Sequence, residues 1–292
     1  MNSGGYGIAF LGMGLMGQPM AARLCKAGYK LTVWNRSAEK AQPLKDVGAE
    51  VAIEPYLAIQ GAEYIMLCLT NGDAVEEVIF GNGGLYGSLY AGQTIIDFSS
   101  ISPHTTRAIA GQLLTERHVN WVDAPVSGGV KGAVSGTLVI MAGGEAEHIN
   151  AARPVLSHLS QKVTYMGAVG AGQAAKLCNQ LIVSTNMLAI AEAMALGRAQ
   201  GVNVDSLPDA FAGGFADSVP LQIFGPRMAC QQHEPILGAI DIMRKDVNTI
   251  EQALKDQDIA FPLLVAVKAL YEKASVNGLG PADLSALMKL YI

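Results

Sequence analysis

Residues 7–28, GIAFLGMGLMGQPMAARLCKAG, decide the fold of the first half of the chain. The first five, Gly7–Leu11, form a short apolar run that is typical of a buried parallel strand. A GxGxxG turn follows, and residues 18–27 then have helical spacing that ends at a glycine. A second apolar run, residues 31–34, completes a strand–helix–strand unit of about 30 residues.

Further apolar runs continue this alternation. The additional predicted strands are residues 64–69, 94–98, 119–124, 138–142 and 163–165. Segments with helical spacing lie between them, including residues 74–79 and 105–116. Strands that alternate with helices indicate a parallel, doubly wound α/β domain of the Rossmann type.

The pattern changes at a glycine-rich segment, residues 167–172. After it the sequence contains no convincing strand, and apolar residues recur with helical spacing. The predicted helices are residues 173–200, 205–213, 245–256 and 262–275. We therefore predict an α/β domain over residues 1–165 and an all-α domain over residues 166–292.

The composition argues against several classes of protein. Half of the 292 residues are hydrophobic and 15% are charged, so folded chain is expected almost throughout. The net charge is −5 and no basic run occurs, which argues against nucleic acid as a partner. The low charge favours a surface hidden in an oligomer.

We expect a cytoplasmic location without a membrane span. The four cysteines lack CxxC spacing, as in a reduced cytosolic protein, and the N-terminus shows no secretory signal. The most apolar stretch, residues 181–197, contains polar side chains and is short for a span. It is interpreted as a buried helix of a soluble protein.

Gly12, Gly14 and Gly17 have the context of a dinucleotide-binding loop, because a strand ends before them and a helix begins after them. The first glycine permits a tight turn, the second lets a pyrophosphate approach the backbone, and the third allows close helix–strand packing. The helix N-terminus offers N–H groups and a positive dipole to the phosphates. The predicted cofactor-binding loop comprises Gly12, Met13, Gly14, Leu15, Met16 and Gly17.

The end of the second strand indicates which dinucleotide binds. An acidic residue there would accept a hydrogen bond from the ribose 2′-hydroxyl of NAD, but Trp34-Asn35-Arg36-Ser37 contains no carboxylate. Arg36 can pair with a 2′-phosphate, assisted by Asn35 and Ser37. NADP is therefore the predicted cofactor, with NAD as the alternative. The competing interpretation of Arg36 is a solvated surface charge.

Four segments in order resemble motifs of the β-hydroxyacid dehydrogenase family, over nearly the whole chain. They are the cofactor loop at residues 12–21, the substrate-binding motif DAPVSGG at residues 123–129, the catalytic motif GQAAKLCN at residues 172–179 and a cofactor-contacting segment at residues 241–247. Members of this family oxidise or reduce small hydroxy acids and semialdehydes. The resemblance implies a nicotinamide cofactor and hydride transfer. It also implies an NADP-binding Rossmann domain over residues 1–165 and a substrate-binding and oligomerisation domain over residues 166–292.

The resemblance identifies Lys176 as the catalytic residue. From the sequence alone, Lys176 lies at the start of a long apolar helix, where burial and the helix dipole would lower its pKa toward that of a general acid. A surface lysine is the alternative on position alone. The resemblance favours proton transfer between Lys176 and the substrate oxygen.

The resemblance also implies the substrate-binding residues. Ser127, Gly128 and Gly129 would hold a substrate carboxylate, whereas on composition alone they form an ordinary glycine turn. Other family members carry a functional asparagine four residues after the lysine, where this chain has Gln180. Asn179 precedes it, and both can share a helix face with Lys176. Which of the two contacts substrate stays open, with Asn179 slightly favoured.

Further cofactor contacts are expected from the ends of two strands. Leu69, Thr70 and Ser100 follow predicted strands, where open parallel sheets bind ligands, and by resemblance they line the ribose and nicotinamide. Lys245 is assigned to the cofactor by resemblance alone. The histidines lack ligand-like spacing, so no metal site is predicted.

Residues 99–103, 179–183 and 213–216 resemble the tartronate semialdehyde reductase (2-hydroxy-3-oxopropionate reductase) branch. The expected function is NADPH-dependent reduction of a small carboxylate-bearing semialdehyde by a homodimer or homotetramer. The alternatives are a 3-hydroxyisobutyrate dehydrogenase, using NAD or NADP, or a glyoxylate/succinic semialdehyde reductase. A 6-phosphogluconate dehydrogenase is disfavoured by the short helical domain. An NADP-binding sensor or scaffold is the non-enzymatic alternative, against which Lys176 argues.

Overall fold

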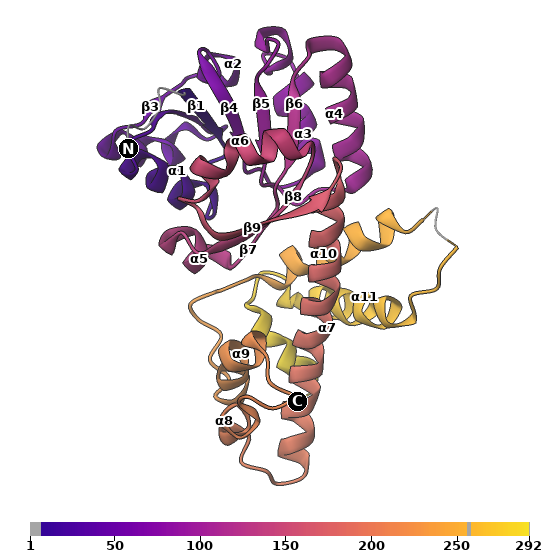
Figure 1. Cartoon of the computed structure of the whole chain (residues 1–292). Coiled ribbons are helices and arrows are strands. Elements are labelled where there is room, and N and C mark those ends of the chain that lie inside the picture. The colour runs from indigo at the N-terminus through magenta and orange to yellow at the C-terminus, as the bar shows by residue number, and fades with distance from the viewer. Residues whose placement is uncertain (1–6, 256–257, 292) are drawn as a thin grey trace. The chain divides into compact units, whose positions relative to one another are not determined.

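The chain divides into two compact units, Met1–Lys176 and Leu177–Ile292. The computed structural model describes residues 7–255 and 258–291 (Figure 1). The division falls inside one long helix, after the segment where the composition changes. The boundary between a cofactor-binding and a substrate-binding domain, placed between residues 165 and 166, stays a prediction.

A nine-stranded sheet forms the centre of the first unit, in the order β3-β2-β1-β4-β5-β6-β8-β7 with β9 paired to β8. The strands are β1 (Gly7–Leu11), β2 (Lys30–Trp34), β3 (Glu50–Val51), β4 (Ala62–Leu67), β5 (Thr94–Asp97), β6 (Asn120–Asp123), β7 (Val126–Ser127), β8 (Leu138–Gly143) and β9 (Ser160–Gly167). The six strands from β3 to β6 are parallel, which confirms the predicted doubly wound arrangement.

The far side of the sheet differs from an all-parallel one. Strand β8 runs antiparallel to β6 and to β7, and β9 is parallel to β8. Neither β3 nor β7 was predicted, because a two-residue strand is too short to show an alternating pattern. Each is recognised as a strand only by its backbone pairing with a neighbouring strand, β3 with β2 and β7 with β8.

Helices cover both faces of this sheet. They are α1 (Gly17–Lys26), α2 (Pro55–Ala58), α3 (Gly72–Phe80), α4 (Pro103–Arg117), α5 (Gly129–Ser135) and α6 (Ala146–Leu156). Strand β1 shows the reason: Ile8 and Phe10 face the core under α1, α5 and α6, while Ala9 and Leu11 face the core under α2, α3 and α4. An apolar run without alternation therefore fits a strand that is buried on both faces.

Among the described residues of the second unit, the named secondary-structure elements are helices, as predicted. The helices are α7 (Ala171–Ala199), which begins in the first unit, α8 (Leu207–Phe211), α9 (Val219–Ala229), α10 (Ile240–Ala253) and α11 (Pro262–Ala274). Met187, Val247, Tyr271 and Leu287 are fully buried in its core.

Two helices of this unit differ from the prediction. Helix α9 was missed, since prolines and a glycine within VPLQIFGPRMA lower its helical propensity. Helix α10 begins at Ile240, ahead of the predicted residue 245, and the predicted end at residue 256 lies outside the described residues.

Helix α7 is long and apolar enough, by length and composition, to cross a membrane, and 44% of its most apolar window is buried. Its residues Met187, Ile190 and Met194 belong to the core of the second unit. The assignment of this helix to a soluble protein stays a prediction.

The turn between β1 and α1 depends on two glycines that leave no room for a side chain. Gly12 has φ +103°, and a Cβ there would lie 2.3 Å from the carbonyl oxygen of Cys68. A Cβ on Gly17 would lie 1.9 Å from the carbonyl oxygen of Gly12. At Gly14, by contrast, an added Cβ meets no atom within 4 Å. Close packing of α1 on the sheet therefore requires the first and third glycines, but not the second.

We expect Gly17→Ala to lower the free energy of unfolding by about 3 kcal/mol, because the added methyl overlaps backbone that cannot move independently of β1. Gly14→Ala is the matched control, with an expected change within about 0.5 kcal/mol. Urea or thermal unfolding measures both. Equal stability of the two variants would contradict the packing role of Gly17.

Candidate active site

The loop between β1 and α1 has the properties of a pyrophosphate-binding loop. Gly14 is exposed with open space over its Cα, so a ligand can reach the backbone there. Helix α1 has no acidic residue in its first turn, and its N-cap residue, Met16, forms no side-chain capping bond. The positive end of the helix is therefore available to phosphate groups. Leu15 is 77% exposed, whereas the side chain of Met13 is buried.

Asn35 connects this loop to the end of β2. Its Oδ1 accepts the backbone N–H of Met13 at 2.8 Å, and its Nδ2 donates to the carbonyl oxygen of Ser37 at 2.9 Å. The Gly12 N–H also donates to the carbonyl oxygen of Trp34, at 2.9 Å. Asn35 thus has a structural task in shaping the predicted cofactor site, in addition to any contact with the cofactor.

Arg36 lies beside an acidic residue at the predicted 2′-phosphate position. Its guanidinium is 3.7 Å from the carboxylate of Glu77 on α3, and the two side chains are 82% and 68% exposed. An exposed ion pair at this distance contributes little to stability, so Arg36 can exchange Glu77 for a phosphate. Glu77 was not predicted from the sequence, since only the fold brings α3 to this position.

The predicted cofactor contacts after β4 and β5 lie at one edge of the sheet. Strands β4 and β5 are neighbours, and Leu67 pairs with Asp97 in the parallel register. The Leu69 N–H donates to Ser99 Oγ at 2.9 Å, which joins the two strand ends. Thr70 is exposed and Ser100 half-buried at this edge. Leu69, Thr70 and Ser100 therefore follow two neighbouring strands at one edge of the sheet, and their contact with the cofactor stays a prediction.

A buried carboxyl group lies directly beneath this edge. Asp97 is fully buried; its Oδ1 accepts the Ser99 N–H at 2.9 Å, and its Oδ2 has no hydrogen-bond partner in the described chain. Burial raises the pKa of Asp97 to about 7, with a smaller effect from the neighbouring Asp123, although the Ser99 hydrogen bonds act in the opposite direction. Asp97 is thus a group whose charge changes near neutral pH.

Asp123 fixes the start of α7. At the end of β6 its two carboxylate oxygens accept the N–H groups of Gly170, at 2.8 Å, and Gln173, at 2.9 Å. A Cβ on Gly143 or on Gly172 would come within 3 Å of the same carboxylate. Burial raises the pKa of Asp123, while these backbone hydrogen bonds act to lower it. The carboxylate thereby serves as a cap supplied by the sheet for the helix that carries Lys176.

Gln173 adds a second attachment between α7 and the sheet. Its Nε2 donates to the carbonyl oxygen of Ser99 at 2.8 Å, and its Oε1 accepts the Ile101 N–H at 3.2 Å. Ser99 also accepts the Leu69 N–H through its hydroxyl. One continuous set of hydrogen bonds therefore links the predicted nicotinamide edge to the first turn of α7.

Lys176 and the predicted carboxylate-binding turn meet within the first unit. The Lys176 Nζ donates to the carbonyl oxygen of Val126 at 2.9 Å, and Val126 immediately precedes Ser127-Gly128-Gly129. Gly128 and Gly129 have φ of +125° and +59°, so both adopt backbone conformations that favour glycine. Lys176 is half-buried, while Gly128 and Gly129 are exposed.

The remaining predicted site residues form a network within the second unit. Asn179 Nδ2 donates to Gln180 Oε1 at 2.8 Å, and Gln180 Nε2 donates to Asp246 Oδ2 at 2.6 Å. Lys245 Nζ is 3.0 Å from Asp246 Oδ1. The predicted substrate amides and the predicted cofactor lysine are therefore connected through Asp246.

Sequence reasoning assigned no role to the buried polar residues behind the site, although three of them lie within the quoted motifs; these residues are Asp97, Asp123, Gln173 and Asp246. Asp97 and Asp123 each end an apolar strand, and a carboxylate in such a place must find hydrogen-bond donors. That pattern was visible in the sequence, but the donors, which lie about 50 residues away for Asp123, were not.

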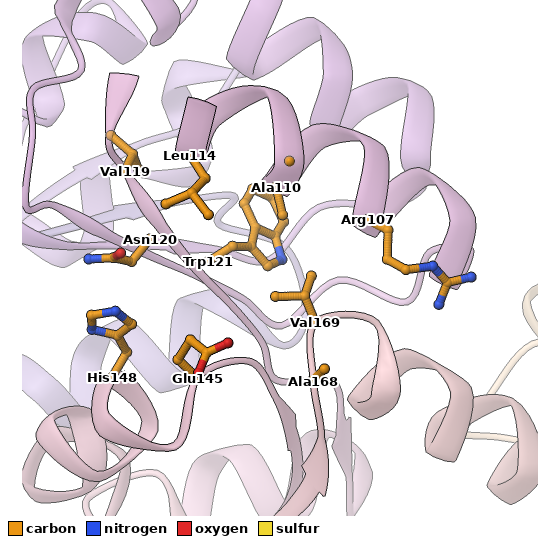
Figure 2. Close-up of a pocket in the computed structure, with 11 residues that line it drawn as sticks. Arg107, Ala110, Leu114, Val119, Asn120, Trp121, Glu145, His148, Ala168 and Val169 are labelled. Atoms are coloured by element: carbon orange, nitrogen blue, oxygen red, sulfur yellow. The ribbon is translucent and has the colours of Figure 1, made fainter. Parts of the chain in front are cut away.

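A pocket of about 310 Å³ lies elsewhere in the first unit, between α4 and the start of α6 (Figure 2). Figure 2 shows Ala110 and Leu114 on one side and Glu145 and His148 on the other. None of the predicted site residues lines it. The described residues also contain no cluster of three or more potential metal-ligating side chains, and the absence of a metal site stays a prediction.

Asp97→Asn removes the buried charge with little change of shape. In the parent, the folded-state pKa of about 7 exceeds the unfolded value of about 3.9, so the contribution of Asp97 to stability is greatest below about pH 4 and is lost as the pH rises through 7. We expect the variant to be more stable than the parent at pH 8, by on the order of 2 kcal/mol, with a difference that shrinks toward pH 5. Urea unfolding at several pH values measures it.

The exposed Asp46 supplies the matched control for this measurement, because Asp46→Asn changes the charge without changing a buried group. A stability difference between Asp97→Asn and the parent that is constant from pH 5 to pH 8 would contradict the raised pKa.

Two family descriptions match the chain in succession. The family described as the NAD binding domain of 6-phosphogluconate dehydrogenase matches residues 7–167. The family described as the NAD-binding of NADP-dependent 3-hydroxyisobutyrate dehydrogenase matches residues 170–291. Together they cover both units.

Relatives of established name match over nearly their whole length. The 2-hydroxy-3-oxopropionate reductase of Escherichia coli is 35% identical over 283 residues, which cover 97% of this chain and 96% of that enzyme. The NAD-dependent L-serine dehydrogenase of Pseudomonas aeruginosa is 32% identical over 290 residues, with 97% of both chains covered. The structure of Mycobacterium tuberculosis 3-hydroxyisobutyrate dehydrogenase with L-serine has a TM-score of 0.88 at 29% identity and covers 98% of both chains. The chain therefore belongs to the β-hydroxyacid dehydrogenase family of NAD(P)-dependent oxidoreductases.

Proposed function

We propose that this enzyme uses NADPH to reduce a small semialdehyde that carries a carboxylate, as in the conversion of 2-hydroxy-3-oxopropionate to glycerate. The observation that carries the proposal is the position of Lys176, whose Nζ lies 2.9 Å from the carbonyl oxygen of Val126, beside Ser127-Gly128-Gly129. A proton donor and a turn suited to an anion thus lie together in one compact unit. The similarity to the E. coli reductase of that substrate supports the choice.

The proposed site separates proton donation from substrate binding. A bound nicotinamide dinucleotide supplies the hydride that the aldehyde carbon accepts. The aldehyde oxygen then becomes an alkoxide, and the Lys176 ammonium donates the proton that it needs. The Ser127 hydroxyl and the N–H groups of Gly128 and Gly129 hold the carboxylate and so orient the reacting carbon.

NADPH is favoured over NADH by the charge at the end of β2. Arg36 can form charge-assisted hydrogen bonds with a 2′-phosphate, and no carboxylate follows β2 to accept the 2′-hydroxyl of NAD. Glu77 moderates this preference, because its carboxylate already faces Arg36 and would repel the phosphate. The loop residues 12–17 belong to the proposed cofactor site, and a contact of Lys245 with the cofactor is proposed from the family resemblance alone.

Lys176→Ala should abolish turnover of the semialdehyde and leave NADPH binding within about twofold, because the lysine acts on the substrate oxygen rather than on the cofactor. A proton-transfer group contributes about 10²- to 10⁴-fold to the rate. NADPH oxidation at 340 nm and a fluorescence titration of NADPH measure the two effects. Lys162→Ala, at an exposed position on β9, is the matched control. Turnover near that of the parent would refute the assignment.

Arg36→Gln should lower kcat/KM for NADPH by about 10- to 100-fold and leave that for NADH nearly unchanged, because only NADPH carries the 2′-phosphate. Glu77→Gln should raise kcat/KM for NADPH by about threefold, because it removes the competing charge. Initial rates with both cofactors test this. If parent rates with NADH equal or exceed those with NADPH, the cofactor assignment is wrong.

A further inference from the structure

We propose that Asp97 is a positioning residue for the cofactor: its carboxylate holds, through Ser99, the segment that begins at Leu69, and a proton on Asp97 loosens that segment and weakens dinucleotide binding. This inference rests on the cofactor site of the proposed function, to which Leu69 and Thr70 are assigned. Asp97 would act on the cofactor through these residues without touching it.

Asp97 occupies a position where a carboxylate is costly. It is the last residue of β5 and pairs in register with Leu67 of β4 and Asp123 of β6, so it lies between two neighbouring strands. It is fully buried, and its Oδ2 accepts no hydrogen bond from the described residues. An asparagine would fit the same space without a charge, so stability alone gives no reason for the acid. Groups that reduce stability in this way are expected where function requires them.

Ser99 connects this carboxylate to the segment after β4. The Ser99 N–H donates to Asp97 Oδ1 at 2.9 Å, and the Ser99 Oγ accepts the Leu69 N–H at 2.9 Å. The Ser99 hydroxyl also hydrogen-bonds with Asp97, which acts to lower the pKa of that carboxyl. A hydroxyl has one proton, so the buried Ser99 directs it to Asp97 and leaves a lone pair for the Leu69 N–H. With Asp97 ionised, each donor in this chain of hydrogen bonds therefore has an acceptor.

A proton on Asp97 disrupts this arrangement. The proton would lie on Oδ2, because Oδ1 already accepts the Ser99 N–H, and within the described chain no acceptor faces it there. The neutral acid is also a poorer acceptor for the Ser99 hydroxyl, since hydrogen bonds to a charged group are about twice as strong as those between neutral groups. The hydroxyl proton is then less firmly directed away from the Leu69 N–H. The attachment of the segment after β4 is weakened.

A second attachment of Ser99 does not involve Asp97. The Ser99 carbonyl oxygen accepts Gln173 Nε2 at 2.8 Å in the first turn of α7. The helix that carries Lys176 therefore keeps this attachment in either state of Asp97. The effect of the proton falls on the segment that begins at Leu69, so it should change the affinity for the dinucleotide and have little influence on kcat at saturating cofactor.

The surroundings of Asp97 place its proton uptake near neutral pH. Burial raises the pKa of Asp97 to about 7, and the nearby Asp123 adds to this. Backbone N–H groups at the start of α7 favour the charged form of Asp123 and act to lower its pKa. Cys68, after β4, stays a neutral thiol, because burial and Asp97 raise its pKa to about 12. On α4, the Arg107 guanidinium lies next to Gly170 and is exposed to solvent.

Cofactor titrations without substrate test the proposal. Fluorescence gives the Kd of NADPH and of NADH at several pH values between 6 and 8.5. We expect the parent to bind both dinucleotides about fivefold more weakly at pH 6 than at pH 8.5, because binding favours the ionised Asp97. NADH is the decisive probe, since it lacks the 2′-phosphate, whose own ionisation lies near pH 6.

Asp97→Asn imitates the uncharged acid. At pH 8.5 its Kd for NADH should be about fivefold above that of the parent, and it should change less than about twofold down to pH 6. At the same pH, kcat at saturating cofactor should stay within about twofold of the parent. Asp46→Asn, at an exposed position, is the matched control and should keep the pH dependence of the parent.

Ser99→Ala removes the connection and leaves the acid in place. It should weaken NADH binding at pH 8.5 and flatten the pH dependence as Asp97→Asn does, so it decides the matter if Asp97→Asn does not fold. Calorimetry in two buffers of different ionisation enthalpy adds a measurement that a purely structural role would not affect. Near pH 7 the parent should release more protons on binding NADH than Asp97→Asn does.

Three results would overturn the inference. They are an NADH affinity of the parent that is the same at pH 6 and pH 8.5, a pH dependence confined to NADPH, and a parent-like pH dependence in Asp97→Asn or in Ser99→Ala. A parent that binds both dinucleotides with the expected pH dependence but reduces no carboxylate-bearing semialdehyde would support the role of Asp97 and refute only the proposed function.

Discussion

The attachment of helix α7 to the sheet by Asp123 is the interaction on which the site depends. A carboxylate inside an apolar strand is costly unless hydrogen bonds satisfy it, and here the donors are the N–H groups of Gly170 and Gln173 at the start of α7. The helix that carries Lys176 therefore begins at a position set by β6. Glycines at 143 and 172 make the approach close enough, because any Cβ there would meet the carboxylate.

Side-chain amides hold the predicted site residues in place. Asn35 joins the glycine loop to the end of β2, Gln173 joins Ser99 and Ile101 to α7, and Gln180 joins Asn179 to Asp246. An amide carries a donor and an acceptor on one rigid plane, so it can bridge two elements and also fix which end faces which. The groups meant for ligands are then pre-oriented by residues that need not touch a ligand themselves.

Prediction from the sequence succeeded where the physical cause is local and failed where it is not. The predicted strands and the α7 helix follow from apolar runs and spacing, and the structure contains them with ends shifted by a few residues. Strand β7 and the antiparallel direction of β8 were not predictable, because both depend on pairing with other strands. Likewise, the sequence did not show that Glu77 lies near Arg36, because only the fold brings α3 to the end of β2.

The sequence alone determined the nucleotide-binding loop, the family and the residues worth testing, because glycine spacing, strand patterning and the lysine motif are each encoded within a few consecutive residues. The tertiary structure alone decided how those residues are arranged. It brought Lys176 to Val126 across 50 positions of the chain, and it paired Gln180 with Asp246 across 66 positions. Hydrogen bonds over such separations depend on how elements pack, and no local pattern in the chain records them.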